Sequence, residues 1–359
     1  MRPITLLLLL LLPFAGTADA DVRIRLSVKV ITDAAGNRPT GSLSSDAQIS
    51  AMIDGANEIL DSTGRGYRFV LAESVIPVTG HPEFFAPPDP PDPDGAGPQT
   101  APDPRETHLN ALDTASRNDP AGFVRRTDAI HCYFNARSYT AICSFPESAT
   151  GILLFGQGSF PTSLAHEAGH FFNLIHTHQG DSGAKGQTPP QTLIPGNMDQ
   201  CDDTEPDHNE WDTDDIAVRL GYSNAAALQI VGTAGDRDRS YRIWRNLMSY
   251  HDPAGRSLIS EDQMDRLTLT ANSSRNAVVT GHSWFVAPDG YNYGGLVNPP
   301  WAGLQASLPF RTIEWALGHV ASPDDVILLR SGAYTPQSAE LTIPCTLAAT
   351  RGPVTLTRP

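Results

Sequence analysis

The stretch from His166 to His176 reads His-Glu-Ala-Gly-His-Phe-Phe-Asn-Leu-Ile-His, and it constrains this sequence more than any other feature. It places three imidazoles and one carboxylate close together along the chain. On an α-helix, His166 and His170 lie one turn apart on the same face, so both rings can reach one metal ion. Glu167 directly follows the first histidine, where it can hold a water that completes the coordination of the metal. The spacing therefore predicts a catalytic zinc site.

His176 cannot reach the same metal from a straight continuation of this helix. Six residues beyond His170 correspond to about 600° of rotation at 3.6 residues per turn, so the helix must end first. Asn173 is the expected end, because asparagine readily adopts the left-handed conformation that closes helices. We therefore expect a positive φ at Asn173 and His176 as the third ligand. His178 is a rival, since both rings of His176-Thr-His178 project the same way from an extended segment, but the spacing favours His176.

A second segment, Asn246-Leu-Met-Ser-Tyr250, lies downstream. Together the two segments resemble the metzincin metalloproteases, whose pattern is H-E-x-x-H-x-x-G-x-x-H followed by a methionine turn. Within the metzincins, the Asn-x-Met-x-Tyr turn and the acidic run from Cys201 to Asp207 resemble the pappalysin-like group. The resemblance extends over roughly residues 22 to 281. It implies an α/β (α+β) zincin fold.

The resemblance also implies roles for individual residues. Met248 is expected to form an apolar floor under the three imidazoles, and Tyr250 to hydrogen-bond the oxyanion of the tetrahedral intermediate. Glu167 is the expected general base on a zinc-activated water, which makes the chain a zinc-dependent endopeptidase. The sequence departs from the family pattern at Asn173, where the family has glycine. It also lacks the second cysteine expected before the methionine turn.

A different zincin class takes its third zinc ligand from a downstream glutamate. Glu205 and Glu210 are the available candidates. That class leaves Met248 and His176 without a role, so it ranks below the metzincin interpretation.

The first twenty residues predict the compartment. Arg2 gives a positive start, Leu6 to Leu12 form an apolar run, and Ala18-Asp-Ala20 is a small-residue cleavage site, the pattern of a signal peptide cut after Ala20. The apolar run is too short to span a bilayer. We therefore expect a secreted or periplasmic protein.

The net charge of −15 argues against nucleic acid or an anionic membrane surface as a partner. A protein or peptide substrate is the expected partner. Part of the charge lies in Asp202, Asp203 and Asp207, which offer hard oxygen ligands within a short span. They are candidate ligands of a structural calcium ion, although their spacing is not that of an EF-hand. A solvated acidic loop is the alternative.

Four cysteines in an exported chain favour disulfides. Cys132 and Cys143 flank a short polar loop and are the expected pair. Cys201 and Cys345 either form a second bond or remain buried thiols.

Apolar periodicity predicts the elements of the protease segment. By the resemblance to zincins, the strand from Gly151 to Gly156 lines the cleft and pairs with extended substrate. Its apolar side chains could equally belong to the core. Ser163 is the expected N-cap of the metal helix. Ser260 and Gln263 form a capping box for a helix reaching about Ala277. Further strands are expected at residues 22–31, 67–78 and 129–135, and further helices at 45–60 and 106–116. The proline-rich residues 87–104 are expected to form a loop.

Residues 282–359 form a second expected module after the signal peptide (1–20) and the metalloprotease domain (21–281). They resemble the start of a right-handed parallel β-helix, with a capping helix over 312–319 and strands at 326–329, 341–344 and 355–357. A full solenoid needs three or more coils, so we expect a small, truncated, β-rich module. The alternative function is that of a carbohydrate-binding or surface-adhesion protein. In that case this module would contact glycan or a cell surface, and the metalloprotease-like domain would be an inert scaffold.

Overall fold

The computed structural model describes residues 22–89, 103–143, 151–178, 199–205, 207, 212–292, 302–337 and 343–357. The predicted signal peptide, Glu210 and most of the proline-rich loop lie outside these residues. Contacts among Cα atoms divide the chain into two compact units. The larger comprises Arg25–Ile59 and Phe69–Leu267, and the smaller Met1–Ile24, Leu60–Arg68 and Thr268–Pro359. The domain boundary after residue 281 stays a prediction.

The sheet of the larger unit has six strands in the order β2-β1-β4-β6-β5, with β3 also paired to β1. Neighbours β1 and β4, and β4 and β6, are parallel, whereas the edge strand β5 runs antiparallel to β6. Parallel strands buried on both faces are expected to be almost continuously apolar, and β6 is buried along its whole length. The strands are β1 (Val22–Ile31), β2 (Tyr67–Leu71), β3 (Ile76–Val78), β4 (Ile130–Phe134), β5 (Ala141–Cys143) and β6 (Ile152–Phe155).

The single strand expected from 67 to 78 is instead two strands. Residues 72–74 bend between β2 and β3. Glu73 lies in this bend and accepts hydrogen bonds from Ser27 and from Arg126, the latter over 2.7 Å. A residue that turns its carboxylate toward these partners leaves the strand pairing, which explains the interruption.

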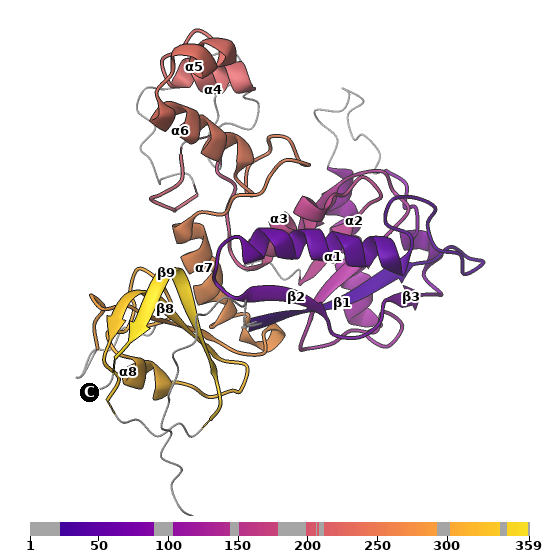
Figure 1. Ribbon diagram of the computed structural model, residues 1–359. Coiled ribbons are helices and arrows are strands. Elements are labelled where there is room, and N and C mark those ends of the chain that lie inside the picture. The colour runs from indigo at the N-terminus through magenta and orange to yellow at the C-terminus, as the bar shows by residue number, and fades with distance from the viewer. Residues whose placement is uncertain are drawn as a thin grey trace, which may run out of the picture. The chain divides into compact units, whose positions relative to one another are not determined.

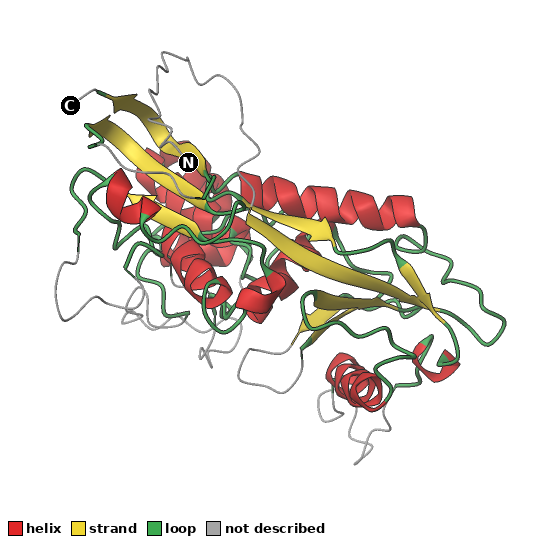
Figure 2. Ribbon diagram, turned by 90° about the horizontal axis from the view of Figure 1, so that it is seen from below, coloured by secondary structure: helices red, strands yellow, loops and turns green. Residues whose placement is uncertain are grey.

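Helices lie on opposite sides of the strands of this sheet (Figure 2). The longest, α1 (Asp46–Asp61), runs beside β1 and β2 in Figure 1, and α2 (Pro104–Asn118) covers an apolar cluster that includes Leu109, Leu112 and Tyr133. The metal helix is α3 (Pro161–Phe171). The remaining helices are η1 (Pro82–Phe84), α4 (Thr213–Arg219), α5 (Ala225–Val231), α6 (Ala234–Arg245) and α7 (Glu261–Ala271).

Two helix boundaries differ from expectation. The N-cap of α3 is Phe160, because Pro161 has the fixed φ that suits a first helical position. Ser163 is therefore the third helical residue, and its Oγ accepts a hydrogen bond from the Phe160 amide over 3.0 Å. The capping box of α7 is confirmed by reciprocal bonds between Ser260 and Gln263 of 2.9 and 3.2 Å. That helix ends at Ala271, before the expected Ala277.

The expected disulfide between Cys132 and Cys143 is wrong. Cys132 in β4 and Cys143 in β5 both lie opposite Leu153 of the intervening strand β6. Two strand spacings separate the Cα atoms by about 9.5 Å, whereas a disulfide requires less than about 7 Å. No disulfide joins any of the four cysteines, all of which fall within the described residues.

The smaller unit contains a three-stranded, all-parallel sheet in the order β7-β8-β9. Its core includes Val286, Phe310 and Ile327. The expected helix is confirmed as α8 (Ile313–Leu317), with Thr312 as its N-cap. The strands are β7 (Ser283–Val286), β8 (Val326–Tyr334) and β9 (Thr346–Leu356), and η2 (Asn276–Val278) precedes them.

Two strand expectations in the smaller unit change. The strand expected at 341–344 lies partly outside the described residues, and the next strand begins at Thr346. Residues 355–356 belong to β9 instead of starting a third strand, because β9 follows β8 across a register shift between Arg330 and Gly332. None of the helices within the described ranges is long and apolar enough to cross a membrane.

Candidate active site

Three imidazoles converge above α3. The Nε2 atoms of His166 and His170 are 3.2 Å apart, and that of His176 lies 3.3 and 2.9 Å from them. Among the described residues, these three histidines are the only group of three or more potential metal ligands brought together in this way. The sequence expectation for this triad is therefore matched in space, with His176 and not His178 as the third member.

The chain reversal that delivers His176 occurs at Asn173, whose φ is 71°. The predicted left-handed residue is thus confirmed. The Leu174 amide donates to the Gly169 carbonyl over 2.8 Å, closing the end of the helix. Arg266 holds the reversal from outside, with its Nε and Nη2 atoms donating to the main-chain and side-chain oxygens of Asn173.

In two of the three histidines, a hydrogen bond at Nδ1 fixes the tautomer of the imidazole. His166 Nδ1 lies 2.7 Å from the Leu247 carbonyl, and His170 Nδ1 lies 2.8 Å from the Leu174 carbonyl. A carbonyl oxygen only accepts, so each Nδ1 carries the hydrogen and each Nε2 presents a lone pair. Carbonyl partners of this kind are the usual support of zinc-binding histidines.

The donor set fits zinc. Zn–N bonds of about 2.0–2.1 Å in tetrahedral geometry separate ligand nitrogens by about 3.3 Å, close to the spacings between the three Nε2 atoms. Burial lowers the pKa of His166 well below its ordinary value and that of His170 to about 4. Both rings are therefore neutral, the form that binds a metal.

The methionine turn lies directly against the metal helix. Met248 is fully buried, and a Cβ placed on Gly169 would come within 2.8 Å of its sulfur. Asn246 Oδ1 accepts from the Met248 amide over 2.8 Å, and the Thr177 amide donates to the Met248 carbonyl over 3.2 Å. Gly169 thus allows the methionine side chain to pack closely against the metal helix. The expected role of Met248 as the floor under the three imidazoles stays a prediction.

Glu167 is buried beside the triad, with 7% of its surface exposed. Burial raises the pKa of its carboxyl group to about 8, opposed by the positive charges of Arg105 and Arg256 and by a hydrogen bond from the Cys143 amide. A carboxylate that is costly to ionise is a strong proton acceptor once ionised.

A cavity of about 580 Å³ opens over these groups. Tyr250 lines it, with its ring centroid 4.5 Å from that of His176. His178 stacks on His176 with centroids 4.8 Å apart and also touches Tyr250. The full lining comprises Asp103, Arg105, Thr140, Ala141, Ile142, Cys143, Ser163, His166, Glu167, His170, His176, Tyr250, Pro253 and Arg256.

The strand along this cavity is not the one expected from the sequence. Residues 151–156 were the expected cleft strand, but β6 lies between β4 and β5 inside the sheet and is fully buried. The edge strand is β5, and all three of its residues line the cavity. This role of β5 could not be predicted, because the strand has only three residues and no readable alternation of apolar and polar side chains.

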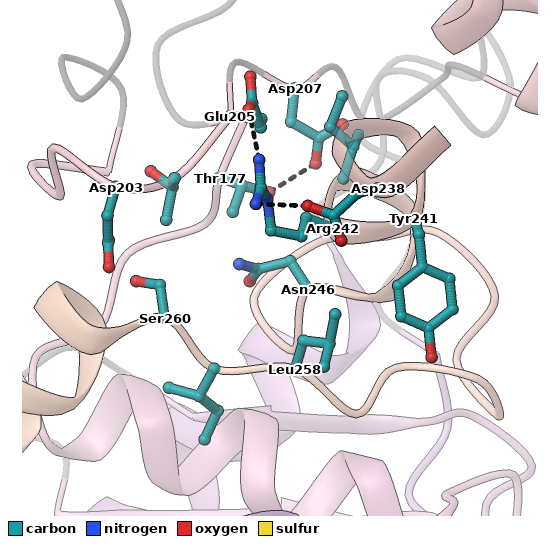
Figure 3. A pocket seen from close by; sticks show the side chains of 13 residues that line it. Thr177, Asp203, Glu205, Asp207, Asp238, Tyr241, Arg242, Asn246, Leu258 and Ser260 are labelled. Atoms are coloured by element: carbon teal, nitrogen blue, oxygen red, sulfur yellow. Dashed lines mark hydrogen bonds and ion pairs between the residues drawn. The ribbon is translucent and has the colours of Figure 1, made fainter. Parts of the chain in front are cut away.

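The acidic run lies at a second, smaller cavity of about 290 Å³ (Figure 3). Asp203 accepts from the Glu261 and Asp262 amides and so caps α7. Asp207 accepts from Thr177 and contacts His251 over 2.6 Å. Asp202, Asp203 and Asp207 form no shared ligand group within the described ranges, and calcium binding stays a prediction.

Glu205, the rival zinc ligand, lies at the same cavity. Figure 3 shows Arg242 between Glu205 and Asp238. Arg239 also binds Glu205, over 3.0 and 3.1 Å. Glu205 is thus held by two arginines and is not a member of the histidine group.

The charged residues around the catalytic cavity were not predicted from the sequence. Asp103 and Arg105 come from the start of α2, and Arg256 follows the methionine turn. None of these three residues belongs to a recognisable motif. The carbonyls of Leu247 and Leu174, which orient the imidazoles, are main-chain groups, so their role does not depend on residue type and cannot be predicted from it.

The metal helix and the methionine turn support each other. The Leu247 carbonyl of the turn orients the His166 ring, and Gly169 of the helix leaves room for the Met248 side chain. These features are those of a metalloendopeptidase. Residues 155–271 match the model of peptidase family M43, described as pregnancy-associated plasma protein-A. That segment covers about a third of the chain and holds the whole triad, Glu167 and the methionine turn.

Two solved structures are similar to this chain at low identity. Mature mirolysin of Tannerella forsythia in complex with a cleaved peptide has 15% identity and a TM-score of 0.42, covering 72% of this chain and 95% of its own. A chaperone–substrate complex has 13% identity and a TM-score of 0.29, covering 46% of this chain and 26% of its own. None of the curated proteins compared matches the sequence. The family match and the site geometry, and not these likenesses, carry the assignment.

Proposed function

We propose that this protein is a secreted zinc endopeptidase in which His166, His170 and His176 hold the metal and Glu167 is the general base. The carrying observation is the convergence of three Nε2 atoms, two of them fixed as acceptors by carbonyls, beside a buried carboxylate. When bound there, zinc supplies Lewis acidity and lowers the pKa of water.

Glu167 accepts the proton of the attacking water and passes it to the leaving amine. Its burial keeps bulk water away from the carboxylate, and the Cys143 amide orients it. Tyr250 lies on the cavity wall near His176, from which its hydroxyl donates to the oxyanion formed at the scissile carbonyl. The edge strand β5 binds the substrate backbone in extended form.

The compartment and the C-terminal module are further parts of the proposal. Export rests on the leader pattern of residues 1–20. A truncated β-helix is supported by the three parallel strands of the smaller unit. No described feature of that unit favours the adhesion alternative with its glycan contact.

The test is a zinc-dependent digest of a peptide library. The purified protein should contain one zinc, lose cleavage with a chelator and recover it with zinc. Glu167→Gln is the matched control: it should keep zinc while turnover falls by about 10² to 10⁴-fold, the contribution of general-base catalysis. Full activity in a zinc-loaded Glu167→Gln variant would reject the proposed base.

A further inference from the structure

The catalytic cavity holds two guanidinium groups that differ in how they are neutralised. Arg105 is bound to Asp103 through Nε and Nη2, at 2.8 to 3.2 Å, and Nη1 reaches Thr140. Its charge is therefore already matched by a carboxylate on its own helix turn. Arg105 has little left to offer a substrate.

Arg256 has no such partner. It forms no ion pair with any carboxylate of the described residues, and its Nη1 donates to the Ser249 carbonyl over 2.7 Å. Its Nη1 also approaches His166 Nδ1 at 3.1 Å. That nitrogen already donates to Leu247, so the approach is a contact between two donors and satisfies neither.

The Arg256 side chain is nevertheless buried, with 7% of its surface exposed, and its Nε has no hydrogen-bond partner. A buried charge with unused donors is costly unless something pairs with it. Arg256 also lines the cavity that holds the triad. Its Nη1 atom contacts Nδ1 of the His166 ring, whose Nε2 belongs to the histidine triad.

We propose that Arg256 is a specificity-determining residue that selects substrates with an aspartate or glutamate side chain directly flanking the scissile bond. The inference rests on the proposed peptidase function. A peptide extended along β5 places its reacting carbonyl at the triad and the adjacent side chains within one residue spacing, about 3.8 Å, of it. A carboxylate there meets a planar guanidinium that forms no ion pair with a carboxylate of the described residues, and the two groups can form a charge-assisted hydrogen bond.

Matched peptide pairs test this. Each pair differs only by glutamate or glutamine, or by aspartate or asparagine, immediately before or after the cleaved bond. For the zinc-loaded wild type, kcat/KM should favour the acid over the amide by about tenfold or more at one of these positions. In zinc-loaded Arg256→Met the acid-to-amide ratio should fall to about one, whatever the change in the absolute rates.

Arg105→Met is the control, because it removes a cation from the same cavity that is already paired, and it should keep the acid-to-amide ratio. If Arg256→Met does not bind zinc, Arg256→Lys replaces it. Lysine keeps the charge but loses the planar fork, so the ratio should drop several-fold. Efficient wild-type cleavage with a ratio near one overturns the role of Arg256 alone. A zinc-loaded wild type that cleaves no peptide overturns the proposed function, and the specificity with it.

Discussion

At the scale of single residues, the site depends on which atoms carry hydrogens. Two main-chain carbonyls fix two histidine tautomers, and burial keeps both rings neutral. In the proposed mechanism, Glu167 is the group whose protonation state changes during turnover. Two predictions belong at this scale.

The first concerns pH. Glu167 must be ionised to accept a proton, and burial raises its pKa from the ordinary 4.5 to about 8, while a bound dication favours the ionised form and lowers the pKa again. We expect kcat/KM to fall as pH decreases, with a midpoint between these two values. Zinc content should be measured at each pH. A profile that stays flat down to pH 4.5 with zinc retained would contradict this role.

The second concerns the third ligand. His176→Ala should lower the zinc stoichiometry sharply, since its Nε2 lies 2.9 and 3.3 Å from the other two ligand nitrogens. His178→Ala should retain the metal, because His178 stacks on His176 and contacts Tyr250 but is not a member of the three-histidine group. Elemental analysis of both variants decides between them. The opposite pattern of zinc loss would assign the ligand to His178.

At the scale of elements, the metal helix and the methionine turn form one packed assembly. Gly169 permits their contact, because a Cβ there would lie 2.8 Å from Met248 Sδ and 3.3 Å from Leu174 Cδ1. Both neighbours are fully buried and have little room to move.

Gly169→Ala should therefore destabilise the protein by about 1–3 kcal/mol, as overpacking does, and weaken zinc binding. This runs against helix propensity, by which alanine is better than glycine. Gly235→Ala in α6 is the control, since its nearest neighbour would be Thr233 Oγ1 at 3.7 Å, and it should be neutral or mildly stabilising. Chemical denaturation of both variants gives the comparison, and equal stabilities would remove the packing explanation.

Sequence reasoning predicted the elements whose signal is local. The cap of α7 and the reversal at Asn173 each depend on residues close together in the chain, and each is confirmed. The strand over 22–31 is also present, but the half-buried alternation expected for it is wrong beyond Leu26, because Ser27 and Lys29 are buried as well. Sequence reasoning could not predict that Cys132 and Cys143 lie two strands apart, or that β5 is the edge strand, because strand order is a property of the assembled sheet. For the same reason Arg105 and Arg256, far apart in sequence, could not be placed in one cavity.

At the scale of the whole molecule, zinc should stabilise the folded state. A ligand that binds only the native form adds RT ln(1 + [L]/Kd), about 4 kcal/mol at a free concentration of 1,000 Kd. We expect chelation to lower the unfolding temperature and zinc addition to restore it, as followed by calorimetry. The His176→Ala variant should show a much smaller shift, and an equal shift would place the stabilising metal elsewhere.

The carbonyl that orients His166 belongs to Leu247, 81 residues further along the chain. During synthesis, His166 and His170 emerge together, but the first ring acquires its orientation only after the methionine turn has been made and has docked. The metal site is thus completed late in the synthesis and folding of the chain. We expect a nascent chain that ends before Met248 to expose its histidines without retaining the metal. The chain would then become able to cleave peptides only after this later segment has been synthesised and packed.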